Sequence, residues 1–352
     1  MHSALKGFAQ AIISVFIPIY LLTLGFSLQD VFIYYITQFT AMAFFWPFFT
    51  MLNPKGVKLN MIYGTLIQLS FYLLLTAVPL IHPVPLAILS GIGISMYWVG
   101  FHSEFVHCHK RKSAAKDFSM VRALTIMGTA FGPFFGGFLI LLTNYQITFF
   151  IAVLLLGLST IPLALTKDYK QKVKTIDLQK VLKSGKKEEG LAYVAHGFCS
   201  MVGAVMWPIF IYLTVKNVLS LGFILSIGSF ILALVTVFIG READKKPKNT
   251  YKAGVFLYTF SWIIRPIFIT PIGLFLTNLY SQITATPWVI AISKRQYQKA
   301  KDPHYLYFRE LHLTLGRLSA LLIAIIYPNL IMMMILAAVV TQLFWPARKL
   351  FK

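Results

Sequence analysis

The stretch GTAFGPFFGG, Gly128 to Gly137, places four glycines and one proline inside a single apolar segment of helix length. In water such a segment is a poor helix, because Gly costs up to about 1 kcal/mol and Pro about 3 kcal/mol relative to Ala. In a bilayer both residues are accepted, because no water competes for the backbone amides and a helix satisfies its own. The stretch therefore predicts a helix that lies in a membrane.

The composition of the whole chain indicates the same solvent. Of its 352 residues, 58% are hydrophobic and only 12% are charged, whereas soluble domains carry about 25% charged residues. Apolar runs long enough to cross a bilayer, roughly 17–25 residues, recur along the whole length. We therefore predict an all-α integral membrane protein of the multi-pass class, with the lipid bilayer as a partner.

The apolar runs divide into about twelve expected spans. They lie near residues 4–24, 29–50, 59–80, 85–107, 118–142, 146–166, 190–214, 218–240, 251–269, 272–293, 305–327 and 329–346. Most breaks are short, but one long break at residues 166–190 separates halves of similar size. We expect an N-terminal six-helix bundle at 1–166, a cytoplasmic basic linker at 167–189 and a C-terminal six-helix bundle at 190–352.

Lysine and arginine are concentrated at every second break. The basic segments are PKGVK, HKRKSAAK, the long break, READKKPKN, SKRQYQKAK and the tail ARKLFK. By the positive-inside rule these loops and both termini are cytoplasmic. Topology and anionic lipid then explain the net charge of +21, so we expect no nucleic-acid partner. We expect a location in the plasma or inner membrane of the cell.

The two halves repeat one pattern at a shift of about 190 residues. The matching pairs are Gly7-Phe8 with Gly197-Phe198, Pro18-Ile19 with Pro208-Ile209, and Trp98-Val99 with Trp288-Val289. Chance is the alternative in a sequence rich in Leu, Ile and Phe, but here Gly, Pro and Trp agree at one shift. The shift covers an even number of spans, so both halves have the same orientation. Parallel repeats of this kind are the plan of one large transporter fold.

Three motifs carry a family resemblance. GREADKK, Gly240 to Lys246, is similar to the loop pattern G-x-x-x-D-[RK] that the major facilitator superfamily has between its eighth and ninth helices. GTAFGPFFGG resembles that family's fifth-helix pattern, and FRELHLTLGR resembles sequences at the start of its eleventh helix. The resemblance covers essentially the full chain. It implies a twelve-helix transporter with two pseudo-symmetric bundles and alternating access.

The loop motif implies a latch. In the resembled family the loop aspartate contacts the other bundle near the start of a helix, where the helix dipole favours an anion. The resemblance implies that Gly240 and Asp244 form this latch with the start of the fifth span, where Arg122 is the expected partner. Pro54 stands at the symmetric position of the first-half loop, so the latch is expected on one side only.

The glycines of the opening stretch imply a close helix contact. Gly128, Gly132 and Gly136 are spaced by four and share one helix face, which lets another helix approach closely. Pro133, followed by Gly137, adds a bend. In the resembled family this stretch is associated with antiporters, and the resemblance implies that it packs against a helix of the other bundle. Ordinary small-residue packing is the alternative.

Polar residues at helical spacing predict the faces that line a central cavity. They come from the first, fourth, seventh and tenth spans, which line the cavity in the resembled family. The candidates are Gln10, Ser14, Ser95, Trp98, His102, Ser200, Asn278, Ser281, Gln282 and Trp288. For any single residue the alternative is hydrogen bonding or packing between helices. A weakly polar, aromatic lining of this kind suits a neutral or lipophilic small organic solute.

The energy source is harder to predict. The chain has no G-x-x-x-x-G-K-[ST] phosphate loop, so we expect no direct use of ATP and no cofactor. His102 and Glu104 lie within one helical turn and His196 lies deep in its span, so these three are the candidates for proton coupling. Arg265 lies near the outer end of its span, where we expect it to snorkel to the interface. Facilitated diffusion fits the charges equally well.

Two other site classes are disfavoured. The segment FHSEFVHCHK, residues 101–110, has enough N, O and S donors for zinc, but the adjacent His107 and Cys108 point to different helix faces, so we expect no metal. No H-E-x-x-H or G-x-S-x-G motif occurs to suggest an enzyme.

We therefore predict a monomeric secondary transporter of the efflux-type, proton-antiport kind. A facilitated uniporter, an uptake transporter, or a non-transporting receptor or scaffold on the same fold are the alternatives.

Overall fold

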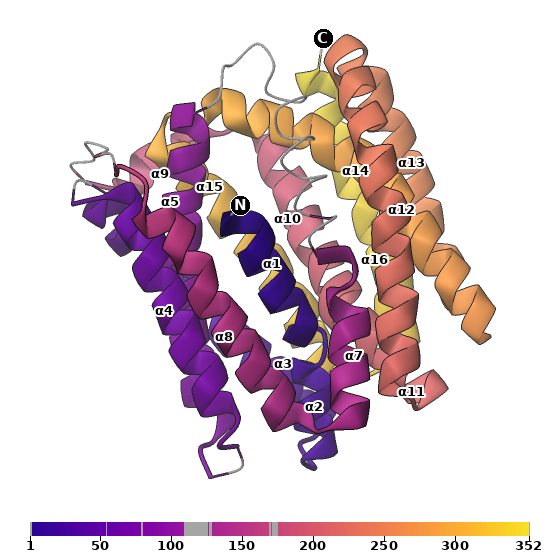
Figure 1. The fold of residues 1–352 in the computed structure, drawn as a ribbon. Coiled ribbons are helices and arrows are strands. Elements are labelled where there is room, and N and C mark those ends of the chain that lie inside the picture. Colours follow the sequence, from indigo (N-terminus) through magenta and orange to yellow (C-terminus); the bar gives the residue numbers. More distant parts are fainter. Residues whose placement is uncertain are drawn as a thin grey trace.

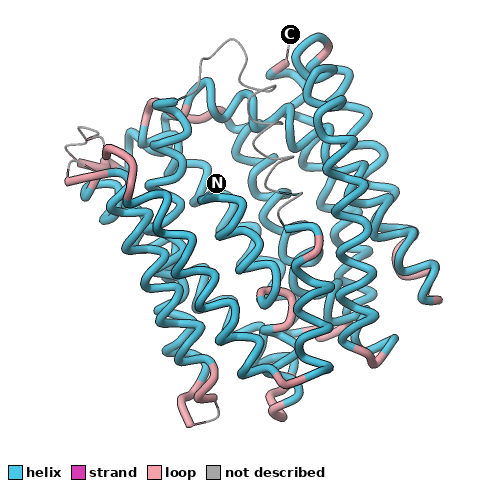
Figure 2. The backbone as a smooth tube through the Cα atoms, in the orientation of Figure 1, coloured by secondary structure: helices cyan, strands magenta, loops and turns pink. Residues whose placement is uncertain are grey.

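A computed structural model describes residues 2–53, 55–78, 80–108, 126, 129–168, 170 and 175–351, without the side chains of 106–108, 234, 237 and 244. The described part is an upright bundle of helices joined by short loops (Figures 1 and 2). The first half comprises α1 His2–Ile13, α2 Ile17–Thr23, α3 Leu28–Leu52, α4 Val57–Leu75, α5 Pro83–Cys108, α7 Gly132–Leu142 and α8 Tyr145–Ala164.

The second half repeats this plan. It comprises α9 Leu178–Ser184, α10 Lys187–Met201, the π-helical turn η2 Val202–Met206, α11 Trp207–Val215, α12 Val218–Lys245, α13 Pro247–Ile264, α14 Pro271–Lys299, α15 Pro303–Ile326, α16 Leu330–Val340 and the 3₁₀ segment η3 Thr341–Leu350. Each of the expected spans overlaps a described helix, and the all-helical membrane fold is confirmed. Within the part of the chain that the structure describes, six segments are long and apolar enough to cross a membrane by themselves, and two shorter apolar helices cover Gly132–Leu142 and Val218–Ala233.

One end of the bundle carries the C-terminus and α9 (Figure 1). The Lys- and Arg-rich breaks that the structure describes lie on this side because the chain alternates between the two ends, so we call it the basic end. The short helix α9 begins at Asp177, whose side chain accepts from the Gln179 amide, and it packs against α15. The basic segment of the long break thus contains a short helix.

Helices that begin at the opposite end are capped by side chains. Asn144, Asn217, Thr270 and Asn329 each accept a hydrogen bond from an amide three residues along the chain. Ser27 makes a full capping box with Asp30. Each cap contributes about 0.5–2 kcal/mol to its helix, so the starts of five helices are set by local sequence.

The internal repeat is visible as matched breaks in two spans. The first span is interrupted between α1 and α2, just before Pro18, and the seventh changes to the π-helical turn η2 just before Pro208. A proline removes a backbone donor and disrupts the preceding turn of helix. The two prolines occupy equivalent positions of the repeat, so the two halves bend their first helices in the same place.

Among the described helices, the halves meet at α7 with α12, α3 with α15, and α2 with α11, besides the side-chain contacts of α5 with α14 described below. In the α7–α12 contact the Phe134 amide donates to the Ser226 hydroxyl at 2.8 Å. In the α3–α15 contact Arg317 lies over the Phe39 ring, 4.8 Å from its centroid. Both contacts lie between the ends of the bundle, so they can act as pivots for relative motion of the halves.

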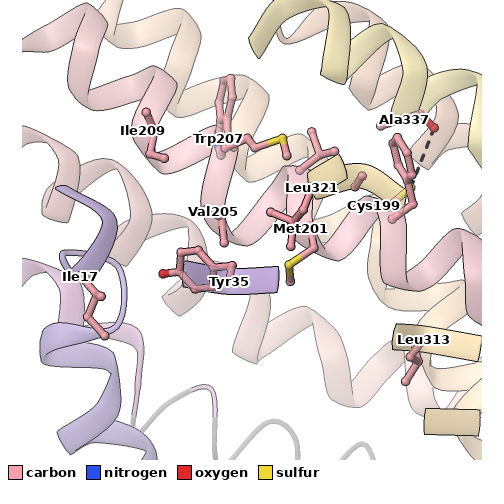
Figure 3. Packing of buried hydrophobic residues seen from close by; sticks show 14 of the residues in the cluster. Ile17, Tyr35, Cys199, Met201, Val205, Trp207, Ile209, Leu313, Leu321 and Ala337 are labelled. Carbon is pink, nitrogen blue, oxygen red and sulfur yellow. Dashed lines mark hydrogen bonds between the residues drawn. The ribbon is translucent and has the colours of Figure 1, made fainter. Parts of the chain in front are cut away.

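The apolar core also runs across this boundary. Figure 3 shows Ile17 and Tyr35 of the first half near Met201, Val205 and Trp207 of the second, and all five belong to one buried cluster. Val202, Val205 and Met206 of η2 are buried in this cluster, whereas Gly203 and Ala204 line a cavity between the halves. Irregular backbone at membrane depth is tolerated where protein covers it.

The glycine face of α7 corrects one expectation. A Cβ at Gly132 would overlap the Ala11 side chain and one at Gly136 would overlap the Ile12 carbonyl, so this face packs on α1, within the first half. The contact with the other half is made by the next face, about 100° round the helix. There a Cβ at Gly137 would lie 2.6 Å from the Val218 carbonyl oxygen of α12.

Pro133 shares that second face. A Cβ on Gly222 of α12 would overlap the Pro133 carbonyl, so the approach is close from both sides. Gly128 lies outside the described residues. Spacing by four identified two tight faces on α7, but it did not indicate which neighbour each face meets.

Candidate functional site

Two cavities lie between the halves. The basic-end cavity has a volume of about 450 Å³ and is lined by Trp98 and His102 of α5, His196 of α10, Tyr297 of α14, and Glu310 and Arg317 of α15. The central cavity has a volume of about 400 Å³ and is lined by Ser14 of the turn between α1 and α2, Tyr35 of α3, Ser229 of α12, Arg265, and Asn278 and Gln282 of α14. Both have walls from each half, so relative motion of the halves would reshape them.

His102 joins the two halves at the basic-end cavity. Its Nδ1 lies 3.1 Å from the Tyr297 hydroxyl, and its ring stacks on Trp98 with centroids 5.4 Å apart. Phe105, one turn further along α5, packs on the same tyrosine with centroids 4.1 Å apart. The sequence identified His102 and Trp98 as cavity residues, and the structure lines the cavity with both.

Glu104 does not accompany His102. Its carboxylate pairs with Lys58 Nζ of α4 at 3.7 Å, on the side of α5 that faces its own half. Residues two apart on a helix do not face each other, which is why the expected His102–Glu104 pair is wrong. His102 has Tyr297 as its described polar neighbour instead.

The acidic residue of the basic-end cavity is Glu310. It is 1% exposed, forms an ion pair with Arg317, and lies 3.4 Å from Arg309 Nη1. The sequence analysis did not propose Glu310 or either arginine as a site residue. The motif FRELHLTLGR contains all three, and the seven-residue spacing of Glu310 and Arg317 places them on one helix face, so this signal was present.

His196 and Trp288 form a contact inside the second half. The ring of His196 meets Trp288 edge-on, with centroids 5.0 Å apart. His196 lines the basic-end cavity, whereas Trp288 is 1% exposed and packs on Phe344 at 4.3 Å. Trp288 is therefore a core residue that supports the cavity wall.

Three of the predicted polar residues line the central cavity: Ser14, Asn278 and Gln282. Asn278 makes two hydrogen bonds: its Oδ1 accepts from the Trp207 indole at 3.2 Å and its Nδ2 donates to the Ile224 carbonyl at 3.2 Å. Gln282 Oε1 lies 3.5 Å from the Ser229 hydroxyl. The cavity thus has a polar side formed mainly by the second half.

The remaining candidates make contacts between or within helices. Gln10 donates to Gln68 at 2.9 Å, Ser200 donates to the Gly197 carbonyl, and Ser281 accepts from Ser261 at 3.3 Å. Ser95 is fully buried, and its hydroxyl has no hydrogen-bond partner in the described structure. Gln10 and Ser281 therefore form hydrogen bonds between helices, which was the alternative interpretation of these polar residues.

Arg265 corrects another expectation. It follows the last residue of α13 and is 4% exposed, so it does not snorkel to the interface. Its guanidinium lies between two indole rings, 4.5 Å from the Trp207 centroid and 4.3 Å from the Trp262 centroid. The bend before Pro208 brings Trp207 to this place, which the sequence pattern could not indicate.

The expected latch falls largely outside the described residues. Gly240 is a buried residue of α12, but the side chain of Asp244 and the whole of Arg122 are not described. The possible metal-binding segment FHSEFVHCHK is also only partly described, because its side chains beyond residue 105 are not described. Across the residues that are described, no group of three His, Cys, Asp or Glu is placed to hold a metal.

The chain is similar to a known family by sequence and to solved structures by shape. The sequence model described as Major Facilitator Superfamily matches residues 3–302. The crystal structure of the human organic anion transporter MFSD10 (TETRAN) superposes with a TM-score of 0.72, covering 98% of this chain and 96% of that chain at 10% identity. Identity at that level shows a shared fold alone. Comparison with curated protein sequences gave no match.

Proposed function

Because this chain belongs to the major facilitator superfamily, we propose that it is a secondary transporter that moves a small organic solute by alternating access. The two moving bodies are residues 1–166 and 190–352, joined by the linker 167–189. The observation that carries the proposal is the pair of cavities whose walls come from both halves. A solute held there is released to one side or the other as the halves rock.

The contacts between the halves suggest what opens and closes. Near the basic end the bridge is His102 with Tyr297, and at the opposite end α2 meets α11. The α7–α12 and α3–α15 contacts lie between them. We propose that the two terminal contacts alternate while the two middle contacts persist, with the basic end cytoplasmic as the positive-inside rule indicates.

The proposed solute has a lipophilic body. Tyr35, Phe39 and Leu225 supply the apolar wall of the central cavity, and polar groups are few. Sites of this kind bury most of a small organic ligand and orient it with a small number of polar contacts. MFSD10, which shares this fold, is described as an organic anion transporter; that description applies to MFSD10.

We propose proton antiport, in the direction of efflux, as the mode of transport. Histidine changes charge near neutral pH, and His102 sits in a contact that must break when the basic end opens. Breaking it exposes Nδ1 to water and so allows proton exchange. His196 is the second candidate, and Glu104, engaged with Lys58, is the weakest of the three.

The test uses purified full-length protein. A panel of aromatic acids, amides and amines is first screened for raising the melting temperature in detergent, since a ligand that binds the folded state stabilises it. The best compound is then measured for flux into proteoliposomes with and without an imposed pH gradient. Gradient-driven flux supports antiport, and equal flux without a gradient supports the uniporter alternative. Binding without any flux would instead favour a receptor on this fold.

A further inference from the structure

Arg265 is a buried cation without a counter-ion. Its side chain lies between Trp207 and Trp262, and its Nε and Nη1 atoms have no hydrogen-bond partner. No Asp or Glu among the described residues forms an ion pair with it. Tyr258 and Cys199 are the titratable groups near it, and both carry no charge at neutral pH when protonated.

This arrangement is unusual for a membrane helix bundle. Arginine stays protonated under all physiological conditions, and charged side chains inside membranes are normally paired with each other or with backbone carbonyls. The two indole faces attract the guanidinium through their ring electrons, but they accept none of its N–H groups. The unsatisfied donors at this place are therefore those of the guanidinium itself.

These donors adjoin the central cavity, which Arg265 lines together with Asn278 and Gln282. Asn278 is not the missing acceptor in this structure, because its oxygen accepts from Trp207 and the Arg265 Nε and Nη1 atoms have no hydrogen-bond partner. That bond holds the Trp207 ring against the guanidinium. The local structure therefore fixes the arginine in the wall of the cavity and leaves part of its hydrogen-bonding capacity unused.

We propose that the central cavity binds the carboxylate of a lipophilic organic anion at Arg265. A guanidinium and a carboxylate match in geometry and can form two parallel hydrogen bonds. The apolar wall from Tyr35, Phe39 and Leu225 receives the body of the same molecule. This inference rests on the proposed transport function and narrows its solute from any lipophilic organic compound to an anionic one.

The test compares two ligands of the same shape. Tritiated 2-naphthoate carries the carboxylate, and tritiated 2-naphthamide replaces it with a neutral group. Binding of each to the detergent-purified full chain is measured by scintillation proximity. We expect the wild type to prefer the naphthoate, and Arg265→Gln to weaken naphthoate binding about tenfold or more while changing amide binding by less than about twofold.

Three further variants control the result. Arg348→Gln removes an exposed arginine that also lies over a tryptophan, 5.6 Å from the Trp345 centroid, and it should change nothing. Arg265→Lys keeps the charge without the two-pronged geometry and should retain part of the preference. Gln282→Glu keeps Arg265 but adds a carboxylate to the same cavity, so it should abolish the preference for naphthoate without any change at the arginine.

Two outcomes would overturn the proposal: equal binding of naphthoate and amide by the wild type, or an undiminished preference in Arg265→Gln. If Arg265→Gln does not elute as a monodisperse protein, Gln282→Glu decides, and a preserved preference there overturns the site. Binding in detergent needs no transport, so a wild type that shows flux but no preference for the naphthoate contradicts this site and leaves the transport proposal standing.

Discussion

The two halves of the chain share a backbone plan and differ in the chemistry of equivalent positions. Lys6 and His196 are equivalent in the repeat, yet Lys6 is 3% exposed and bonds to Gln68 within its own half, whereas His196 lines the basic-end cavity. Leu75 and Arg265 are also equivalent, one an apolar core residue and the other a buried cation. The two halves therefore share the bends of their backbones but not the chemistry of their equivalent side chains.

The tryptophans of the repeat diverge in the same way. Trp98 is 39% exposed and lines a cavity, while Trp288 is 1% exposed and packs in the core. In the second half, charged groups at Arg265, Arg317 and Glu310 reach the boundary between the halves. The first half contributes mainly aromatic walls and one histidine. The comparison suggests that the second half holds most of the ionic chemistry and the first half the apolar surface.

The largest expected effect comes from the buried ion cluster of the second half. Glu310→Gln leaves Arg317 and Arg309 without their carboxylate, and breaking a buried ion pair on one side costs about 3–5 kcal/mol. The matched variant in the first half, Glu104→Gln, removes a longer and partly exposed pair with Lys58 that is worth about 0–1 kcal/mol. Unfolding titrations in mixed micelles measure both. Equal losses of unfolding free energy in the two variants would mean that the ion pairs of the two halves contribute equally to stability.

The next effect separates packing within the first half from contact between the halves. Gly136→Leu forces a side chain into the Ile12 carbonyl of α1, and overpacking of this kind costs about 1–3 kcal/mol or more. Gly137→Leu disturbs the α12 contact instead, so we expect it to stop transport and to leave insertion and monodispersity closer to normal. Detergent melting curves and proteoliposome flux together distinguish the two. The assignment of faces is wrong if Gly136→Leu keeps full stability.

The third prediction compares the two histidines. His102→Gln should abolish pH-gradient-driven flux but retain counterflow exchange, which needs binding and alternation without net proton movement. His196→Gln should keep gradient-driven flux, because the contact of its ring with Trp288 lies within one half and need not break. Should the two variants behave in the opposite way, the proton site belongs to the second half.

The smallest effect concerns the asymmetric latch. Asp244→Asn should shift the resting population toward the state open at the basic end, since the first-half loop has Pro54 where a second latch would stand. A cysteine placed at Ser293, which lines the basic-end cavity, would report the shift with an impermeant thiol reagent after Cys108 and Cys199 are changed to Ser. The control is the same cysteine variant with Asp244 retained. Equal labelling of the two proteins argues against the latch.

Much of the fold could be read from local pattern. Apolar run length located the spans, and matched residues such as Pro18 and Pro208 indicated the repeat. The asparagine and threonine caps and the bends before these prolines are local features too, but they were identified in the structure. These features depend on residues close together in sequence, because a helix satisfies its own backbone within each span. The family, the all-helical membrane fold and the parallel repeat were accessible for the same reason.

The candidate site was accessible in part. Helical spacing identified Ser14, Trp98, His102, Asn278 and Gln282, all of which line one of the two cavities. Spacing defines a face of a helix, but it does not give the rotation of that face relative to its neighbours. For this reason Gln10 and Ser281 turned out to bond to other helices.

By itself the sequence determined that this chain is a membrane bundle of two related halves, because solvent preference and helix periodicity are properties of short segments. The tertiary structure decided which side chains meet. It turned Gly132 and Gly136 to α1, paired Glu104 with Lys58 and not with His102, and enclosed Arg265 between Trp207 and Trp262. Each of these contacts joins residues of different helices, and their relative rotation and depth are set by close packing of the whole bundle.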